Sequence, residues 1–161
     1  MGWAALSLRK MTLKQRINSL EQRLVNISQQ EMSMYDSSSY AQQAIGVQKT
    51  QALSHLQQIF ENNSNTIKQQ YAGATSTQDL NNYNTAIQTE QLSLQYNQMI
   101  QNSLFQAKES AMQNSINQSE TQIALEKEQV ETQLEAARAE YESLDQACSS
   151  DIKSGAINFG V

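Results

Sequence analysis

The stretch that decides the fold is YAGATSTQDL, residues 71–80, close to the midpoint of the 161-residue chain. Gly73 is suited to the C′ position that ends a helix. Either Thr75 or Ser76 is suited to cap the next helix, and the polar residue three positions after each cap completes a capping box. The pattern therefore predicts a turn over residues 72–76 between two helices.

Upstream of this turn, apolar residues recur with the alternating four-three spacing of a coiled coil. This stripe contains Leu6, Leu13, Ile17, Leu20, Leu24, Ile27 and Met34. It predicts one amphipathic helix from about residue 3 to about residue 71.

The apolar stripe moves to a neighbouring face in the second half of this helix. The new stripe contains Leu53, Leu56, Phe60, Ile67 and Tyr71. Either the partner surface changes there, or the helix is interrupted. The candidate interruptions are DSSS at residues 36–39 and then NNSN at residues 62–65, because these side chains compete for backbone hydrogen bonds.

Downstream of the turn, a second stripe predicts a helix from about residue 77 to about residue 148. It contains Ile116, Ile123, Val130, Leu134, Ala137, Tyr141, Leu144 and Cys148. Residues 149–161 break the pattern, since Gly155 and Gly160 flank an alternating apolar segment. They are predicted to form an extended or flexible tail.

Two helices of nearly equal length joined by so short a turn predict an all-α fold, a long antiparallel helical hairpin or coiled coil. Residues 1–148 would form one elongated domain. The absence of proline agrees with few turns. In this arrangement the basic start of the chain lies against its acidic end. The expected pairs are Arg9 with Glu140, Lys14 with Glu135 and Arg23 with Glu126.

The charge pattern argues against two other classes of protein. A formal net charge of -5 disfavours general binding to nucleic acid. At the start of the chain the basic residues follow the apolar run, whereas a cleaved signal has them first. The apolar run over residues 2–8 is too short to span a bilayer. We therefore expect no cleaved signal and no membrane span.

The sequence contains no recognisable catalytic, cofactor-binding or metal-binding pattern. His55 is the only histidine, and no cysteine or carboxylate lies at ligand spacing from it. The close carboxylate pairs are two residues apart, so they point to different helix faces. We expect no enzyme activity, no cofactor and no metal.

Several apolar residues fall off the main seams, which run from Leu6 to Met34 and from Ile116 to Cys148, and would remain exposed in an isolated hairpin. They are Leu8, Met32, Val47, Leu53, Leu92, Met99, Leu125 and Phe159. Exposed apolar area along a helix marks a docking surface. We therefore expect self-association into a bundle or filament, with the two stripes as the self-association seam.

The opening MGWAALSLRKMTLKQRINSLE resembles the start of many short bacterial helical proteins. The two long terminal helices with a polar middle resemble the coiled-coil framework of flagellin and of type III secretion filament proteins. The resemblance implies a structural protein of an extracellular filament or tube, exported without a cleaved signal, with itself and secretion machinery as partners. The alternative is a cytoplasmic adaptor or secretion chaperone that binds a client helix.

Overall fold

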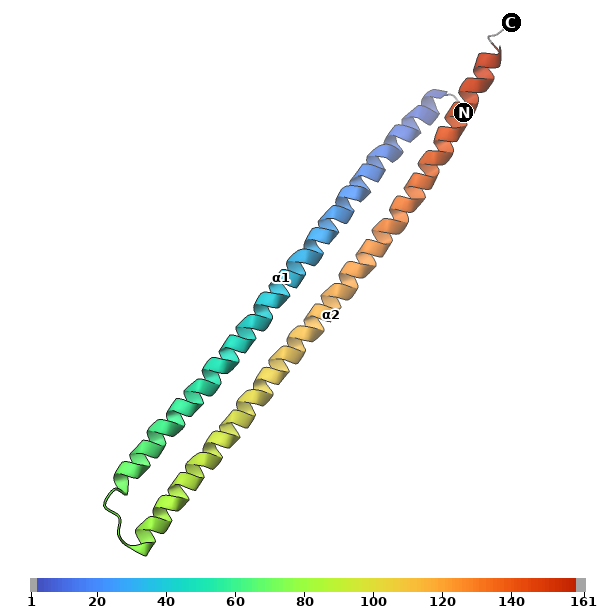
Figure 1. Cartoon of the computed structure of the whole chain (residues 1–161). Helices are drawn as coiled ribbons and strands as arrows, with labels where there is room; N and C mark the ends of the chain where they lie inside the picture. The colour runs from blue at the N-terminus through green and yellow to red at the C-terminus, as the bar shows by residue number, and fades with distance from the viewer. Residues whose placement is uncertain (1–2, 159–161) are drawn as a thin grey trace. The chain divides into compact units, whose positions relative to one another are not determined.

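The fold is two long helices packed against each other. The computed structural model describes residues 3–158, and the surroundings of side chains over residues 4–153. Helix α1 runs over Trp3–Gln70 and helix α2 over Thr77–Asn158, and the chain reverses between them (Figure 1). The predicted all-α helical hairpin is confirmed.

Helix α1 is continuous, so neither candidate interruption is a break. Residues 36–39 and 62–65 are helical. Their polar side chains lower helix propensity by only about 0.5 kcal/mol each, which packing against a second helix outweighs. In the second segment, Asn63 Nδ2 donates a hydrogen bond to Glu90 Oε1 on α2 at 2.7 Å. This contact holds the asparagine-rich segment against its partner helix.

The turn between the helices is capped at one end as a capping motif predicts. Ser76 Oγ accepts a hydrogen bond from the Asp79 backbone N–H at 3.1 Å and donates one to Asp79 Oδ2 at 2.6 Å. Ser76, and not Thr75, is therefore the cap of α2. Gly73 lies in the turn without a positive φ, so it does not adopt the left-handed conformation in which glycine commonly ends a helix.

Helix α1 ends with backbone hydrogen bonds between residues three positions apart. The Ala72 N–H bonds to the Gln69 carbonyl at 3.3 Å, and the Ala74 N–H bonds to the Tyr71 carbonyl at 3.0 Å. These hydrogen bonds satisfy two carbonyl groups at the end of α1, which would otherwise need a glycine-based helix cap. Tyr71 also meets Tyr83 edge to face, with ring centroids 5.9 Å apart, and joins the two helices beside the turn.

The predicted extended tail is wrong over residues 149–158, which continue α2. No proline interrupts this segment, and an interior glycine costs a helix only about 1 kcal/mol relative to alanine. Phe159 and Gly160 lie outside the described residues.

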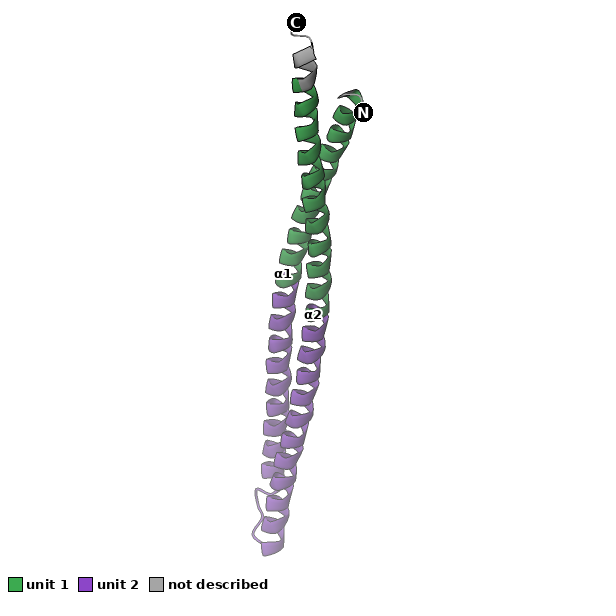
Figure 2. Ribbon diagram, turned by 90° about the vertical axis from the view of Figure 1, so that its right-hand side faces the viewer, with its two compact units in different colours: residues 1–35, 117–161 green, residues 36–116 purple. Residues whose placement is uncertain are grey.

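The hairpin consists of two compact units, each built from a segment of both helices (Figure 2). Unit 1 comprises residues 1–35 and 117–161, and unit 2 comprises residues 36–116. The two units differ in how their helices pack.

Unit 1 contains a continuous apolar core. Five residues are buried together in it: Leu20, Ile27, Val130, Leu134 and Ala137. Ile17, Leu24 and Ile123 pack against them. The contacts keep the four-three spacing of a seven-residue repeat, which makes paired helices wind around each other. Figure 2 shows the two helices of unit 1 crossing.

Unit 2 has a sparser and more polar seam. Its covered residues on α1 change to four-four-three spacing, an 11-residue repeat, through Ile45, Lys49, Leu53, Leu56, Phe60, Ser64 and Ile67. Phe105 and Ser64 are the buried residues among the described part of this unit, and Ser64 Oγ has no hydrogen-bond partner there. His55 lies outside this seam and is exposed.

Candidate self-association surface

The residues predicted to form the self-association seam are covered by the other helix of the same unit. Leu6, Leu13, Leu20, Ile27, Val130 and Leu134 are buried. Ile17, Leu24, Met34, Ile116, Ile123, Tyr141 and Leu144 are half-buried. The sequence correctly located an apolar seam, but this seam packs within one chain. The buried members of the seam are therefore not exposed for contact with a second copy.

Ion pairs flank the seam of unit 1. Arg9 Nε donates a hydrogen bond to Glu140 Oε1 at 3.0 Å, and Arg23 Nη2 donates one to Glu126 Oε1 at 2.9 Å. Both pairs were predicted. Arg138 pairs with Glu21 at 2.7 Å on the other side. All six partners are partly exposed, so each pair contributes at most about 1 kcal/mol.

The third predicted pair, Lys14 with Glu135, does not form among the described residues. Glu135 shares its helix face with Glu128 and Glu142, at seven-residue spacing, and not with Glu126 and Glu140, which pair across the seam. Lys10 pairs with Asp145, and its ammonium group lies 5.3 Å from the centre of the Tyr141 ring. The hydrogen bond to Asp145 is the largest cause that raises the pKa of Lys10.

Arg16 forms no ion pair among the described residues, and the alignment of α1 with α2 explains why. It lies midway in sequence between Arg9 and Arg23, whose partners are Glu140 and Glu126. The corresponding position midway along α2 is Gln133, a neutral residue. Arg16 therefore faces an amide where its neighbours face carboxylates.

A second set of α1 residues repeats with four-three spacing on the side of the helix roughly opposite the seam. We call it the α1 outer face: Ala4, Leu8, Met11, Gln15, Asn18, Gln22, Val25, Gln29 and Met32. Every member is exposed and none is charged. Met32 is 67% exposed and Leu8 62%. An ordinary solvent-facing helix surface is rich in charge, so this face is unusual for a surface that only meets water.

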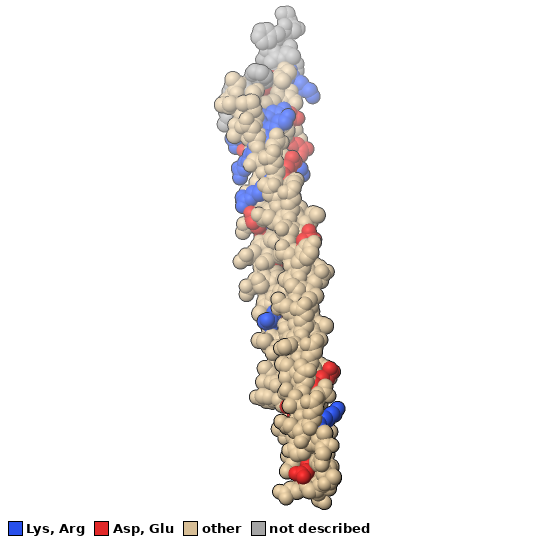
Figure 3. Space-filling view, turned by 90° about the vertical axis from the view of Figure 1, so that its left-hand side faces the viewer, with Lys and Arg blue, Asp and Glu red and all other residues tan. Residues whose placement is uncertain are grey.

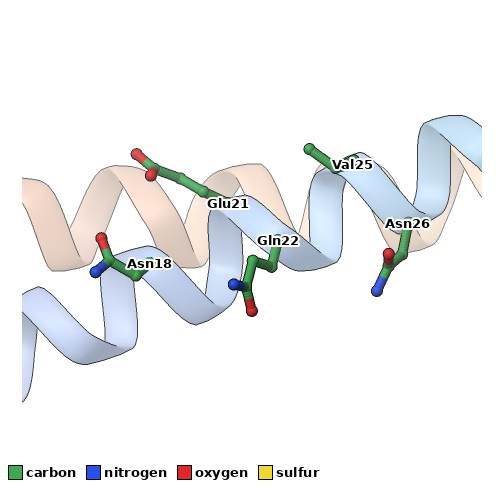
Figure 4. Close-up of a pocket in the computed structure, with 5 residues that line it drawn as sticks. All are labelled: Asn18, Glu21, Gln22, Val25 and Asn26. Carbon is green, nitrogen blue, oxygen red and sulfur yellow. The ribbon is translucent and has the colours of Figure 1, made fainter.

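A shallow hollow lies on the α1 outer face (Figure 4). Its lining residues are Asn18, Glu21, Gln22, Val25 and Asn26, all on α1. Asn18, Gln22 and Asn26 follow one another four residues apart along α1. In Figure 4, Gln22 and Asn26 point to one side of the helix, and Val25 points to the other. Amide groups at this spacing can hydrogen-bond to polar groups of a neighbouring helix.

Helix α2 carries a matching outer face in unit 1. We call it the α2 outer face: Gln122, Leu125, Gln129, Thr132, Ala136, Ala139, Ser143, Gln146 and Ser150. These residues are also exposed and uncharged, with four-three spacing. Glu128, Glu135 and Glu142 lie beside it at seven-residue intervals and form no ion pair among the described residues.

Unit 2 also exposes apolar side chains, although it carries few charges. They are Tyr40, Val47, Ile59, Leu80, Leu92, Tyr96, Met99, Ile100 and Leu104. On the face of the molecule in Figure 3, charged side chains gather mainly over unit 1, and neutral atoms dominate over unit 2.

Most of the off-seam apolar residues were predicted correctly. Leu8, Met32, Val47, Leu92, Met99 and Leu125 are exposed. Leu53 is half-buried instead, because the four-four-three spacing of unit 2 brings it into the seam. The sequence interpretation missed the two outer faces as periodic surfaces. A search for uncharged positions at heptad spacing, offset from the apolar seam, would have found them.

Chemical groups that often mark a catalytic or metal site do not gather in the described part of the chain. There, no group of three or more His, Cys, Asp or Glu side chains is placed to hold a metal ion. Cys148 is a free thiol buried in the seam. Over residues 3–158, neither helix has a segment long and apolar enough to cross a membrane.

No protein-family model matches this chain, and comparison with curated proteins and with solved structures gives no match. Its function is therefore inferred from the arrangement of its residues.

Proposed function

We propose that this protein is a structural protein whose hairpins self-assemble through helix packing into a filament or tube. The observation that carries the proposal is the α1 outer face, an uncharged and exposed stripe with the same spacing as the buried seam. Exposed apolar residues along a heptad repeat favour a second helix as their partner, because such a helix covers all of them at once.

The energetic argument concerns the large side chains of that stripe. Leu8, Met11, Val25 and Met32 are each more than half exposed. Covering one such side chain contributes up to about 1.5 to 3 kcal/mol. Part of this is lost in ordering the helices against each other. Because the contact repeats along the helix, the remaining free energy of burial is still sufficient to support association.

The proposal is tested by sedimentation velocity over a range of protein concentrations, combined with negative-stain electron microscopy. We expect species that grow with concentration and elongated or tubular particles in the images. A small oligomer of fixed size at every concentration would contradict a filament.

We further propose that the filament lies outside a bacterial cell and leaves it through secretion machinery without cleavage of a signal. This proposal extends the resemblance drawn from the sequence pattern, in which two long terminal helices with a polar middle resemble the coiled-coil framework of flagellin and of type III secretion filament proteins. Immunoblotting of surface, supernatant and cytoplasmic fractions tests the location, with a cytoplasmic enzyme as the control for lysis. Protein confined to the cytoplasmic fraction would contradict it.

The second candidate function is a cytoplasmic adaptor or secretion chaperone that binds a client helix. The sparse seam of unit 2 favours it, because Leu92, Met99 and Ile59 are exposed beside few buried contacts. A client helix could cover these residues. Affinity purification from the native cell distinguishes the two functions: an adaptor co-purifies with a different protein in fixed proportion, whereas a filament protein is recovered mainly with itself.

A further inference from the structure

The two helices of unit 1 differ in the exposed charges that form no ion pair inside the chain. On α1, Lys14 and Arg16 are exposed and form no ion pair among the described residues. On α2, the exposed carboxylates without an ion pair are Glu128, Glu131, Glu135 and Glu142. The pairs inside the chain thus leave positive charge on one helix and negative charge on the other.

We infer that the α1 outer face packs antiparallel against the α2 outer face of a second copy of this chain. The inference rests on the proposed self-assembly and names the two surfaces that carry it. Contact between two α1 faces would bring together bases that are unpaired inside the chain, and contact between two α2 faces mainly acids. Contact of α1 with α2 is the one combination in which these remaining charges attract.

The register inside the chain indicates how the two copies align. Arg9 pairs with Glu140 and Arg23 with Glu126, so residues 14–16 of α1 lie level with residues 133–135 of α2. If the second copy repeats this register, Lys14 lies level with its Glu135, and Arg16 lies level with its Gln133. Both helices keep the same four-three spacing on their outer faces. The same alignment of the two faces can therefore continue along the whole length of unit 1.

The same register brings large side chains opposite small ones. Leu8 and Met11 lie level with the segment of the second copy that contains Ala139 and Ser143. The segment that contains Asn18, Gln22 and Asn26 lies level with the segment around Gln129 and Thr132. The apolar contacts are thus interspersed with groups that can hydrogen-bond across the interface.

This contact has a consequence for the form of the assembly. The interface uses two different surfaces, so each copy offers its α1 outer face to one neighbour and its α2 outer face to another. Such a heterologous contact continues from copy to copy until the row closes into a ring or extends without limit. A dimer that stops at two copies is not expected.

The test uses charge reversal on each face. Lys14→Glu with Arg16→Glu makes an acidic variant, and Glu135→Lys with Glu142→Lys makes a basic variant. Each variant alone opposes like charges across the interface. We expect the concentration for half-maximal assembly to rise about tenfold, which corresponds to about 1.4 kcal/mol. Mixed one to one, the variants regain assembly, because every contact between unlike variants again joins opposite charges.

The matched controls reverse charges in unit 2. Lys68→Glu with Lys108→Glu is the control for the acidic variant, and Glu61→Lys with Glu109→Lys is the control for the basic one. All four residues are exposed. The controls are expected to assemble like the unchanged chain. Circular dichroism at low concentration checks that every variant is helical.

The outcomes separate the inference from the proposed function. If the unchanged chain assembles but the two variants assemble equally well, or if their mixture assembles no better than either alone, the named interface is wrong while self-assembly stands. If the unchanged chain forms no assembly at any concentration, both the interface and the filament are wrong.

Discussion

At the scale of single residues, two valines show how differently the faces of one fold contribute to stability. Val130 is 1% exposed in the core of unit 1, whereas Val25 is 57% exposed on the α1 outer face. Both lie in long helices, but Val130 falls on the apolar seam and Val25 does not. The other helix therefore packs on Val130 and leaves Val25 exposed.

Substitution of these valines should separate stability from assembly. Val130→Ala is expected to lower the free energy of unfolding by about 2 kcal/mol, because it leaves a cavity in a filled core. Val25→Ala is expected to change it by less than about 0.5 kcal/mol in the unassembled chain, while it weakens assembly. Urea unfolding at low concentration and sedimentation at high concentration measure the two effects. Equal losses of stability would contradict the assignment of the faces.

Ser64 provides a second prediction at this scale. It is buried in unit 2, and its hydroxyl has no hydrogen-bond partner among the described residues. Ser64→Ala removes this buried polar group and should raise the free energy of unfolding by about 1 kcal/mol. The control is Ser54→Ala at an exposed position of the same helix, which should have almost no effect. A stabilisation no larger than that of the control would indicate that the Ser64 hydroxyl is satisfied in solution.

At the scale of helices, the sequence predicted the existence and order of both elements and all of their ends except the C-terminal end of α2, which lies ten residues later than expected. The four-three spacing of unit 1 was sufficient, because seven-residue periodicity leaves one choice of buried face. The spacing change in unit 2 was noticed but admitted two explanations, and only the structure showed a continuous helix with a changed repeat. The tail was misjudged because glycines near Ile157 suggested an extended segment, although nothing there prevents a helix.

The same reasoning fell short for the candidate surface. Periodicity identifies a stripe, but it does not say whether the partner is in the same chain or in another. Leu20 and Val130 were assigned to self-association and instead pack against each other's helix within the chain. The outer faces give a weaker signal in the sequence. Gln15 or Gln22 is recognised as a contact residue only when it is considered together with the exposed apolar residues on the same helix face.

The cap of α2 provides a prediction at this scale. Ser76 satisfies a backbone N–H at the first turn of the helix, and Thr75 makes no such contact. Ser76→Ala should therefore lower the free energy of unfolding by about 1 kcal/mol. Thr75→Ala serves as the control and should change it by less than about 0.5 kcal/mol. Thermal and urea unfolding of the unassembled chain measure both, and a larger loss for the Thr75 variant would place the cap one residue earlier.

Pairing between the helices gives another prediction. Gln133→Glu places a carboxylate opposite Arg16, which completes a row of three ion pairs with those of Arg9 and Arg23. The hairpin should gain up to about 1 kcal/mol. Because Arg16 would then be paired inside the chain, assembly should weaken. Gln129→Glu, on the α2 outer face and away from Arg16, should give no comparable gain in stability.

At the scale of the whole molecule, the two units divide the sources of stability unevenly. Unit 1 contains the apolar core and all five ion pairs between described residues. Unit 2 is held by a polar seam, with Lys49, Glu90 and Gln98 half-buried among its contacts. A two-helix contact with so few buried side chains has little to resist local opening. We therefore expect unit 2 to open more readily than unit 1.

Hydrogen exchange tests this difference residue by residue. In the unassembled chain, backbone amides of residues 36–116 should exchange at least about tenfold faster than those of residues 6–35 and 117–148, which corresponds to an opening free energy lower by about 1.4 kcal/mol. Val130→Ala should narrow the gap, because it weakens unit 1 without touching unit 2. Assembly should slow exchange in unit 1 if the two outer faces meet there. Equal protection of both units in the unassembled chain would mean that the polar seam of unit 2 is as strong as the apolar core of unit 1, and that polar contacts rather than buried apolar area hold the hairpin closed.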